Sequence, residues 1–119
     1  MGKDDEKNFK RNFAKHCPHA DGRILEVGAG TGRITKIIHE VTKCRVDVIE
    51  KNPQWSAHMK KWTEICDKVY TGDARDIKTI IEETDKRSFA TVVIVGVTQY
   101  LDDKDFCQLL KDIREVVLR

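Results

Sequence analysis

Apolar side chains follow two patterns along this chain, and each pattern is typical of one kind of element. The helical pattern places apolar residues three or four positions apart on one face, as in Ile34, Ile37, Ile38 and Val41. The other pattern is a run over 90–97 that is nearly all apolar and β-branched, typical of a strand buried on both faces of a parallel sheet. Together they predict strands over 24–28, 45–50, 68–71 and 90–97, and helices over 4–16, 31–42, 53–65, 76–86 and 103–118.

The predicted order is a leading helix followed by four strand–helix units. Units of this length build an α/β fold, a doubly wound parallel sheet with helices on both faces. Residues 1–19 would form a helical extension, and 20–119 the main domain. The last helix is expected to bury five apolar residues: Phe106, Leu109, Leu110, Ile113 and Val117. Ligands of such sheets bind beyond the carboxyl ends of the strands, where the strand order reverses.

The first strand runs directly into three glycines at alternate positions, Gly28, Gly30 and Gly32. Bare backbone between a strand and a helix lets a ligand approach closely and directs free N–H groups at it. The dinucleotide fingerprint G-x-G-x-x-G would need its third glycine at Arg33. The spacing therefore favours a nucleoside cofactor over a dinucleotide, although an ordinary tight turn would also use glycine.

Three acidic residues stand at or near strand ends. Glu26 lies in an otherwise apolar strand, where a carboxylate needs a cationic partner, either a cofactor's amino group or a lysine or arginine of the chain. Glu50 closes the second strand about 20 residues beyond the glycine loop, the position from which a carboxylate binds a ribose diol. Asp73 follows the third strand, where it could contact a ligand or cap the next helix.

Four stretches resemble, in order and spacing, the class I S-adenosylmethionine-dependent methyltransferases: 24–33, 46–50, 69–74 and 89–97. The resemblance covers about 20–119 and implies a Rossmann-like sheet with strand order 3-2-1-4, S-adenosylmethionine as cofactor, and methyltransferase activity. The glycine loop would hold the ribose and methionyl portion, Asp73 and Ala74 the adenine, and Val97 would lie near the methyl group. The cofactor-binding residues that it implies are Glu26, Gly28, Ala29, Gly30, Gly32, Glu50, Lys51, Asp73, Ala74 and Val97.

The sheet of that family continues beyond a fourth unit, whereas this sequence stops at Arg119. We therefore expect a C-terminally incomplete sheet with its fourth strand at an edge, where unpaired backbone groups would favour self-association. Thr98, Gln99 and Tyr100 follow that strand and would face the acceptor, although Tyr100 could equally serve packing. No catalytic residue is assigned. A catalytically silent cofactor-binding module is the alternative function.

Trp55, Met59 and Trp62 form a stripe at helical spacing, which is more typical of a core than of a binding site. Trp55 is the exception to test, because it would lie near the adenine edge.

Composition and charge limit the classes of binding partner that this chain is expected to have. The 119 residues carry a net charge of +2, so neither nucleic acid nor an anionic membrane is favoured. No apolar run reaches the length of a membrane span and no signal peptide precedes the domain, which predicts a cytoplasmic protein. We expect a small-molecule or lipid acceptor. A protein acceptor stays open, because the loop over 28–36 also resembles protein N-terminal methyltransferases, and an NAD-dependent oxidoreductase is a third hypothesis.

The four cysteines stand far apart, as reduced thiols of a cytosolic protein would: Cys17, Cys44, Cys66 and Cys107. The stretch His16-Cys17-Pro18-His19 mixes metal-ligand types, but proline breaks its geometry and no second cluster accompanies it, so it predicts a polar loop and no metal site.

Overall fold

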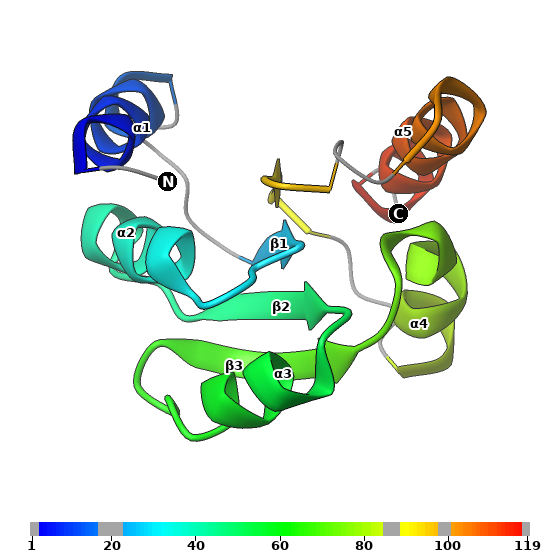
Figure 1. The fold of residues 1–119 in the computed structure, drawn as a ribbon, viewed down its shortest axis with the longest axis horizontal. Coiled ribbons are helices and arrows are strands. Elements are labelled where there is room, and N and C mark those ends of the chain that lie inside the picture. The colour runs from blue at the N-terminus through cyan, green and yellow to red at the C-terminus, as the bar shows by residue number, and fades with distance from the viewer. Residues whose placement is uncertain (1–2, 17–22, 85–88, 98–100, 118–119) are drawn as a thin grey trace.

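The computed structural model describes residues 3–16, 23–84, 89–97 and 101–117. Helices and strands alternate along the chain, as Figure 1 shows. In chain order the elements are α1 (Lys3–His16), β1 (Ile24–Val27), α2 (Arg33–Thr42), β2 (Val46–Glu50), α3 (Pro53–Met59), β3 (Cys66–Thr71), a 3₁₀ turn η1 (Ala74–Asp76), α4 (Ile77–Thr84), β4 (Thr91–Ile94) and α5 (Asp103–Val117).

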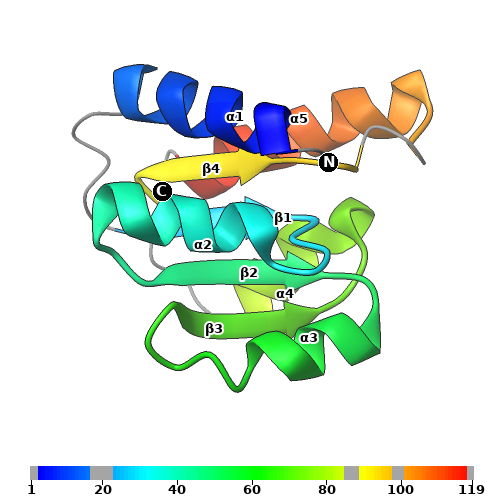
Figure 2. The same ribbon diagram turned by 60° about the vertical axis from the view of Figure 1, so that its left-hand side comes forward.

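The strands form one parallel sheet in the order β3-β2-β1-β4, which confirms the predicted fold class and strand order (Figure 2). In the central strand β1, Ile24 lies opposite Val46 of β2 and Thr91 of β4. The register between β2 and β3 is interrupted by an irregularity between Val46 and Val48. β2 and β4 pair with opposite sides of β1, so the strand order reverses at β1, where the glycine loop begins, as expected for a ligand-binding edge.

The two faces of the sheet are covered by different helices (Figure 1). On one face, Ile24 of β1 packs in a cluster with α1, α2 and Met59 of α3. On the other, Leu25 and Val27 pack against α4 and α5. The alternation along β1 follows from the period of two in a strand, and it points Glu26 toward α2 with the first cluster.

The N-terminal helix is attached to α2 through its aromatic residues. Phe9 and Phe13 stack with ring centroids 5.7 Å apart, and Phe13 is buried in the cluster beneath α2. Two ion pairs also join these helices, Arg33 to Glu6 at 2.5 Å and Lys10 to Glu40 at 3.1 Å.

The structure corrects three details of the sequence prediction. The third helix ends at Met59 rather than near Ile65, because the chain turns tightly after it, with the amides of residues 62, 65 and 66 bonded locally. In α5, Leu110 is 46% exposed and Val116 is buried. Leu109 meets the sheet, and Leu110 lies about 100° further round the helix, facing away.

The fourth strand is the third correction. It spans only Thr91–Ile94 and is mostly half-buried, not covered on both faces as its apolar run predicted. It pairs with β1 alone within the described residues, so it stands at the edge of this sheet. Gly96, with φ 77°, lies just beyond its end.

Candidate cofactor-binding site

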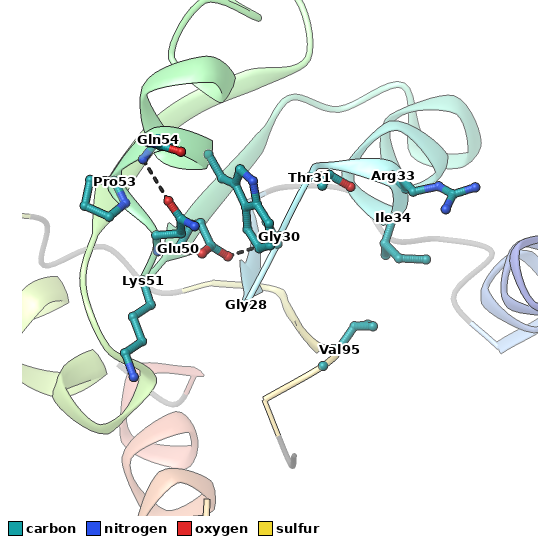
Figure 3. Close-up of a pocket in the computed structure, with 14 residues that line it drawn as sticks. Gly28, Gly30, Thr31, Arg33, Ile34, Glu50, Lys51, Pro53, Gln54 and Val95 are labelled. Atoms are coloured by element: carbon teal, nitrogen blue, oxygen red, sulfur yellow. Dashed lines mark hydrogen bonds between the residues drawn. The ribbon is translucent and has the colours of Figure 1, made fainter. Parts of the chain in front are cut away.

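A cavity of about 1210 Å³ opens at the carboxyl ends of β1 and β2. Three segments far apart in the sequence line it: the glycine loop with the start of α2 (28–31 and 33–34), the end of β2 with the start of α3 (50–55), and the residues after β4 (95–96). Figure 3 shows Gly30 between Glu50 on one side and Arg33 and Ile34 on the other. The cavity thus lies where the topology places a ligand in an open α/β sheet.

The three glycines of the loop have different physical reasons to be glycine. All adopt positive φ, at 81° for Gly28, 59° for Gly30 and 87° for Gly32. A Cβ on Gly28 would lie 2.4 Å from a methyl of Val97, and one on Gly32 would lie 2.4 Å from the ring of Trp62. A Cβ on Gly30 would meet nothing closer than 3.7 Å. Packing within the protein therefore demands Gly28 and Gly32, whereas Gly30 presents open backbone to the cavity.

Glu50 links the two main walls of the cavity. Its Oε1 accepts a hydrogen bond from the Gly30 amide at 2.6 Å (Figure 3), and its Oε2 accepts one from the Asn52 amide at 2.7 Å. The residue is only 5% exposed, yet it lines the cavity. Both its partners are neutral, and each carboxylate oxygen keeps capacity for another donor. A pair of adjacent hydroxyl groups is the ligand that this arrangement suits.

The wall beside Glu50 is fixed by the start of α3. Asn52 caps the helix by accepting from the Gln54 amide at 2.9 Å, and Pro53 occupies the first turn, where its ring is tolerated. One turn further, the Ser56 hydroxyl lies 2.6 Å from that of Thr71, which attaches α3 to β3. Trp55, between these anchors, projects from the helix with 43% of its surface exposed.

Glu26 is fully buried and does not line the cavity. Its Oε1 accepts a short hydrogen bond from the hydroxyl of Thr35 in α2, and its Oε2 has no hydrogen-bond partner among the described residues. Burial raises the pKa of Glu26 to about 7; the bond from Thr35 opposes this shift, and the nearby charge of Glu50 adds to it. The chain therefore supplies no cation to this carboxyl group in the described residues, which leaves the alternative of an internal salt bridge without support.

Asp73 lies at the end of β3 and is occupied by other groups of the protein. Its Oδ1 caps η1 by accepting from the Arg75 amide at 2.9 Å. Its Oδ2 lies 3.2 Å from the Arg75 guanidinium and 3.6 Å from the Lys51 ammonium. Arg75 also binds Asp105 of α5 at 2.9 Å. Asp73 thus serves the capping role that the sequence left open as the alternative.

The structure brings half of the expected cofactor residues together around the cavity and leaves the others outside it. Those that line it are Gly28, Ala29, Gly30, Glu50 and Lys51; those that do not are Glu26, Gly32, Asp73, Ala74 and Val97. Sequence reasoning did not assign Arg33, Ile34, Gln54, Val95 or Gly96, whose only signal was their position beside assigned residues. Thr98, Gln99 and Tyr100, expected near the acceptor, lie outside the described residues, as does the segment Cys17-Pro18-His19.

None of the helices in the described ranges combines the length and the apolar character needed to cross a membrane.

Comparison with known proteins identifies the family. The methyltransferase domain family matches residues 24–119. A curated relative, an ornithine lipid N-methyltransferase of Singulisphaera acidiphila, is 31% identical over 80 residues, which cover 63% of this chain and 42% of the relative.

Solved structures agree with this assignment. The glycopeptide N-methyltransferase MtfA complexed with S-adenosyl-L-methionine superposes with a TM-score of 0.74 at 25% identity, over 92% of this chain and 48% of that one. CalS10, an amino pentose methyltransferase from Micromonospora echinaspora, shares the fold with a TM-score of 0.68 at 18% identity, over 96% of this chain and 45% of its own. The chain spans about half the length of the proteins it matches, and by its sequence and fold it belongs to the methyltransferase domain family.

Proposed function

We propose that this chain binds S-adenosylmethionine in the cavity beside Glu50 and forms the cofactor-binding part of a methyltransferase. The observation that carries the proposal is the Glu50 carboxylate, held by two backbone amides next to the open backbone of Gly30. The complex of MtfA, a protein of the same fold, with S-adenosyl-L-methionine supports the choice of cofactor.

The residues of the cavity fit the parts of this cofactor. The ribose diol would donate to Glu50, each of whose oxygens has one acceptor position beyond its bond to an amide. The methionyl carboxylate would lie toward Arg33 and Ile34, at the start of the ten-residue helix α2. That helix has no acidic residue in its first turn and no side-chain cap, so its positive end is available to an anion.

Glu26 would serve the cofactor's amino group, directly or through water. It is the buried carboxyl group whose second oxygen lacks a hydrogen-bond partner among the described residues. An ammonium group brought near it would favour the ionised form, which burial now disfavours. Of the residues that the resemblance implied, Ala74 as an adenine ligand and Val97 near the methyl group stay predictions. The adenine role of Asp73 also stays a prediction, which its pairing with Arg75 and Lys51 disfavours.

The cofactor, when bound, supplies an electrophilic methyl group on a sulfonium centre. The chain's own part is to hold that group in position beside an acceptor and to exclude water. Holding reactants in a reactive geometry can contribute about 7–11 kcal/mol without any acid or base. Positioning by the glycine loop and Glu50 is therefore the contribution that these residues are built to make.

We further propose that the acceptor is an amine of a small molecule or lipid. The relative is an ornithine lipid N-methyltransferase, MtfA is a glycopeptide N-methyltransferase, and CalS10 is an amino pentose methyltransferase. The second candidate is a module that binds the cofactor without catalysing methyl transfer.

Calorimetric titration with S-adenosylmethionine, S-adenosylhomocysteine and NAD tests the binding proposal. We expect the first two to bind and NAD not to bind. Binding of NAD alone would revive the oxidoreductase hypothesis and reject the methyltransferase. Transfer of a labelled methyl group to ornithine lipid in detergent micelles then separates the enzyme from the silent module. A panel of N-terminal peptides tests the protein-acceptor alternative in the same assay.

A further inference from the structure

We propose that the purine of the bound nucleoside stacks on the indole of Trp55, so that this chain recognises the base by stacking rather than by hydrogen bonds from Asp73. The inference rests on the proposed function and specifies how that site selects its ligand. It assigns a specificity-determining role to a residue of α3.

Trp55 is an exposed aromatic side chain in an otherwise well-packed region. Among the described residues, only Trp55 and Leu110 are exposed large hydrophobic residues, at 43% and 46%. Unlike Leu110, Trp55 lines the large cavity. An indole held at the wall of a concave site offers a rigid flat face, and covering it with a planar ligand removes apolar surface from water.

The backbone under Trp55 is fixed, so its place in the cavity is a property of the fold. The preceding cap at Asn52 and the following anchor at Ser56 hold that turn of α3, and Met59 is fully buried one turn later. The six-membered part of the indole lies 3.7 Å from where a Cβ on Gly30 would stand. Because the Gly30 amide binds Glu50, the indole, the open glycine and the ribose-binding carboxylate meet at one place.

The residues at the two ends of the cavity determine how the ligand is oriented within it. Arg33 and Ile34 lie at the positive end of α2, which suits the methionyl carboxylate. With the sugar on Glu50, the base must then extend toward the other wall, formed by residues 51–55. Trp55 is the aromatic residue of that wall, and a purine stacks on an aromatic face whatever its ring substituents.

Asp73 is in a poor position to read the base. It does not line the cavity, one of its oxygens caps η1, and the other lies between Arg75 and Lys51. A hydrogen bond to the adenine amino group would compete with these two cations. A site that relies on stacking discriminates weakly between purines, whereas a site built around a base-specific hydrogen bond rejects the altered base by orders of magnitude.

Intrinsic fluorescence tests the contact directly, because the chain has only two tryptophans. Trp62 serves as the matched control: it lines no part of the large cavity, and it packs against Gly32 and under the Lys36 ammonium. In a Trp62→Phe background, S-adenosylhomocysteine should quench or shift the emission of Trp55. In the reciprocal Trp55→Phe variant, the emission of Trp62 should change little.

Affinity measured by calorimetry tests the energetic role. Trp55→Ala should raise the Kd for S-adenosylhomocysteine about tenfold or more, and Trp55→Phe should restore most of the loss. Trp55→Leu keeps apolar area without a stacking face and should resemble the alanine variant more than the phenylalanine variant. Thermal unfolding of each variant without ligand identifies any loss of folding, and the fluorescence result does not depend on these variants.

S-inosylhomocysteine, which lacks the adenine amino group, tests how the base is read. We expect its Kd to lie within about threefold of that of S-adenosylhomocysteine, and Asp73→Asn to change neither value by more than about threefold. Rejection of the inosyl compound by a hundredfold or more, or binding of S-adenosylhomocysteine with unchanged Trp55 emission, overturns the stacking role and leaves the proposed function intact. Failure of the unmodified chain to bind S-adenosylhomocysteine at all overturns both.

Discussion

Glu50 and Asp73 close two neighbouring strands of the same sheet, and the protein treats them in opposite ways. Glu50, at the end of β2, is 5% exposed and accepts bonds from two neutral amides. Asp73, at the end of β3, caps a turn and lies beside two cations. Two backbone amides orient the Glu50 carboxylate, and each of its oxygens keeps an acceptor position for a further donor. The carboxylate of Asp73, in contrast, is already paired with the cations of Arg75 and Lys51.

Glu26 is a third carboxyl group, and its surroundings differ from those of both Glu50 and Asp73. It is buried like Glu50, but it has one bond, from Thr35, and an oxygen without a partner among the described residues. Its pKa is raised to about 7 mainly because burial disfavours the charge. The three carboxyl groups therefore differ in their hydrogen-bond and ionic partners.

Gly30→Val should abolish measurable binding of S-adenosylhomocysteine. The position has a φ of 59°, which a β-branched residue avoids, and its side chain would fill the space between the loop and Trp55. Because the Gly30 amide binds Glu50, the substitution also displaces the Glu50 carboxylate. Calorimetry gives the binding result, and Gly30→Ala provides the same backbone strain with less added volume. Wild-type affinity in the valine variant would place the cofactor elsewhere.

Glu26 should make the unliganded protein less stable as the pH rises. A carboxyl group whose pKa is raised from 4.5 to about 7 in the folded state contributes its full stability below pH 4.5, and this contribution is lost as the pH approaches 7. The expected change is about 3 kcal/mol in the free energy of unfolding. Urea denaturation at pH 5 and pH 8 measures it.

Glu26→Gln is the matched variant for that measurement, since the amide oxygen still accepts from Thr35. It should remove most of this pH dependence, and it should lose affinity for the cofactor if Glu26 serves the amino group. An unchanged pH profile in this variant would show that other groups cause the dependence.

Glu50→Ala should weaken binding of S-adenosylhomocysteine by about 1–3 kcal/mol, through the loss of two hydrogen bonds to a charged acceptor. Asn52→Ala serves as a control for the wall of the cavity: it removes the cap of α3, at about 1 kcal/mol of stability, but leaves the carboxylate. An unchanged dissociation constant for the Glu50 variant would place the ribose elsewhere.

Asp73→Asn should have the smallest effect on binding. An asparagine can still cap η1, and the ion pairs to Arg75 and Lys51 are partly exposed, so each contributes at most about 1 kcal/mol. Thermal unfolding should therefore shift slightly while the Kd for S-adenosylhomocysteine stays within about threefold. A loss as large as that of Glu50→Ala would make the two carboxylates equivalent and restore Asp73 as an adenine ligand.

Local signals in the sequence were enough to predict the fold and the centre of the site. The alternating apolar patterns predicted the strands and helices, and the ends of β1 and β2 placed Gly30 and Glu50 at one edge. The predictions that were wrong concern residues whose burial depends on which other elements pack beside them. Leu110 and the residues of β4 are apolar in a regular pattern, yet which of them are covered depends on what packs beside them.

Residues close together in the chain are enough to predict the order of the elements, the glycine loop and the acidic residue that ends the second strand. In contrast, packing between distant segments sets which glycine faces open space, which carboxylate lines the cavity and which tryptophan is exposed. Gly28 is closed by Val97, Gly32 by Trp62, and Asp73 is occupied in part by Lys51. These partners are brought together by packing across the sheet, and no local pattern encodes them.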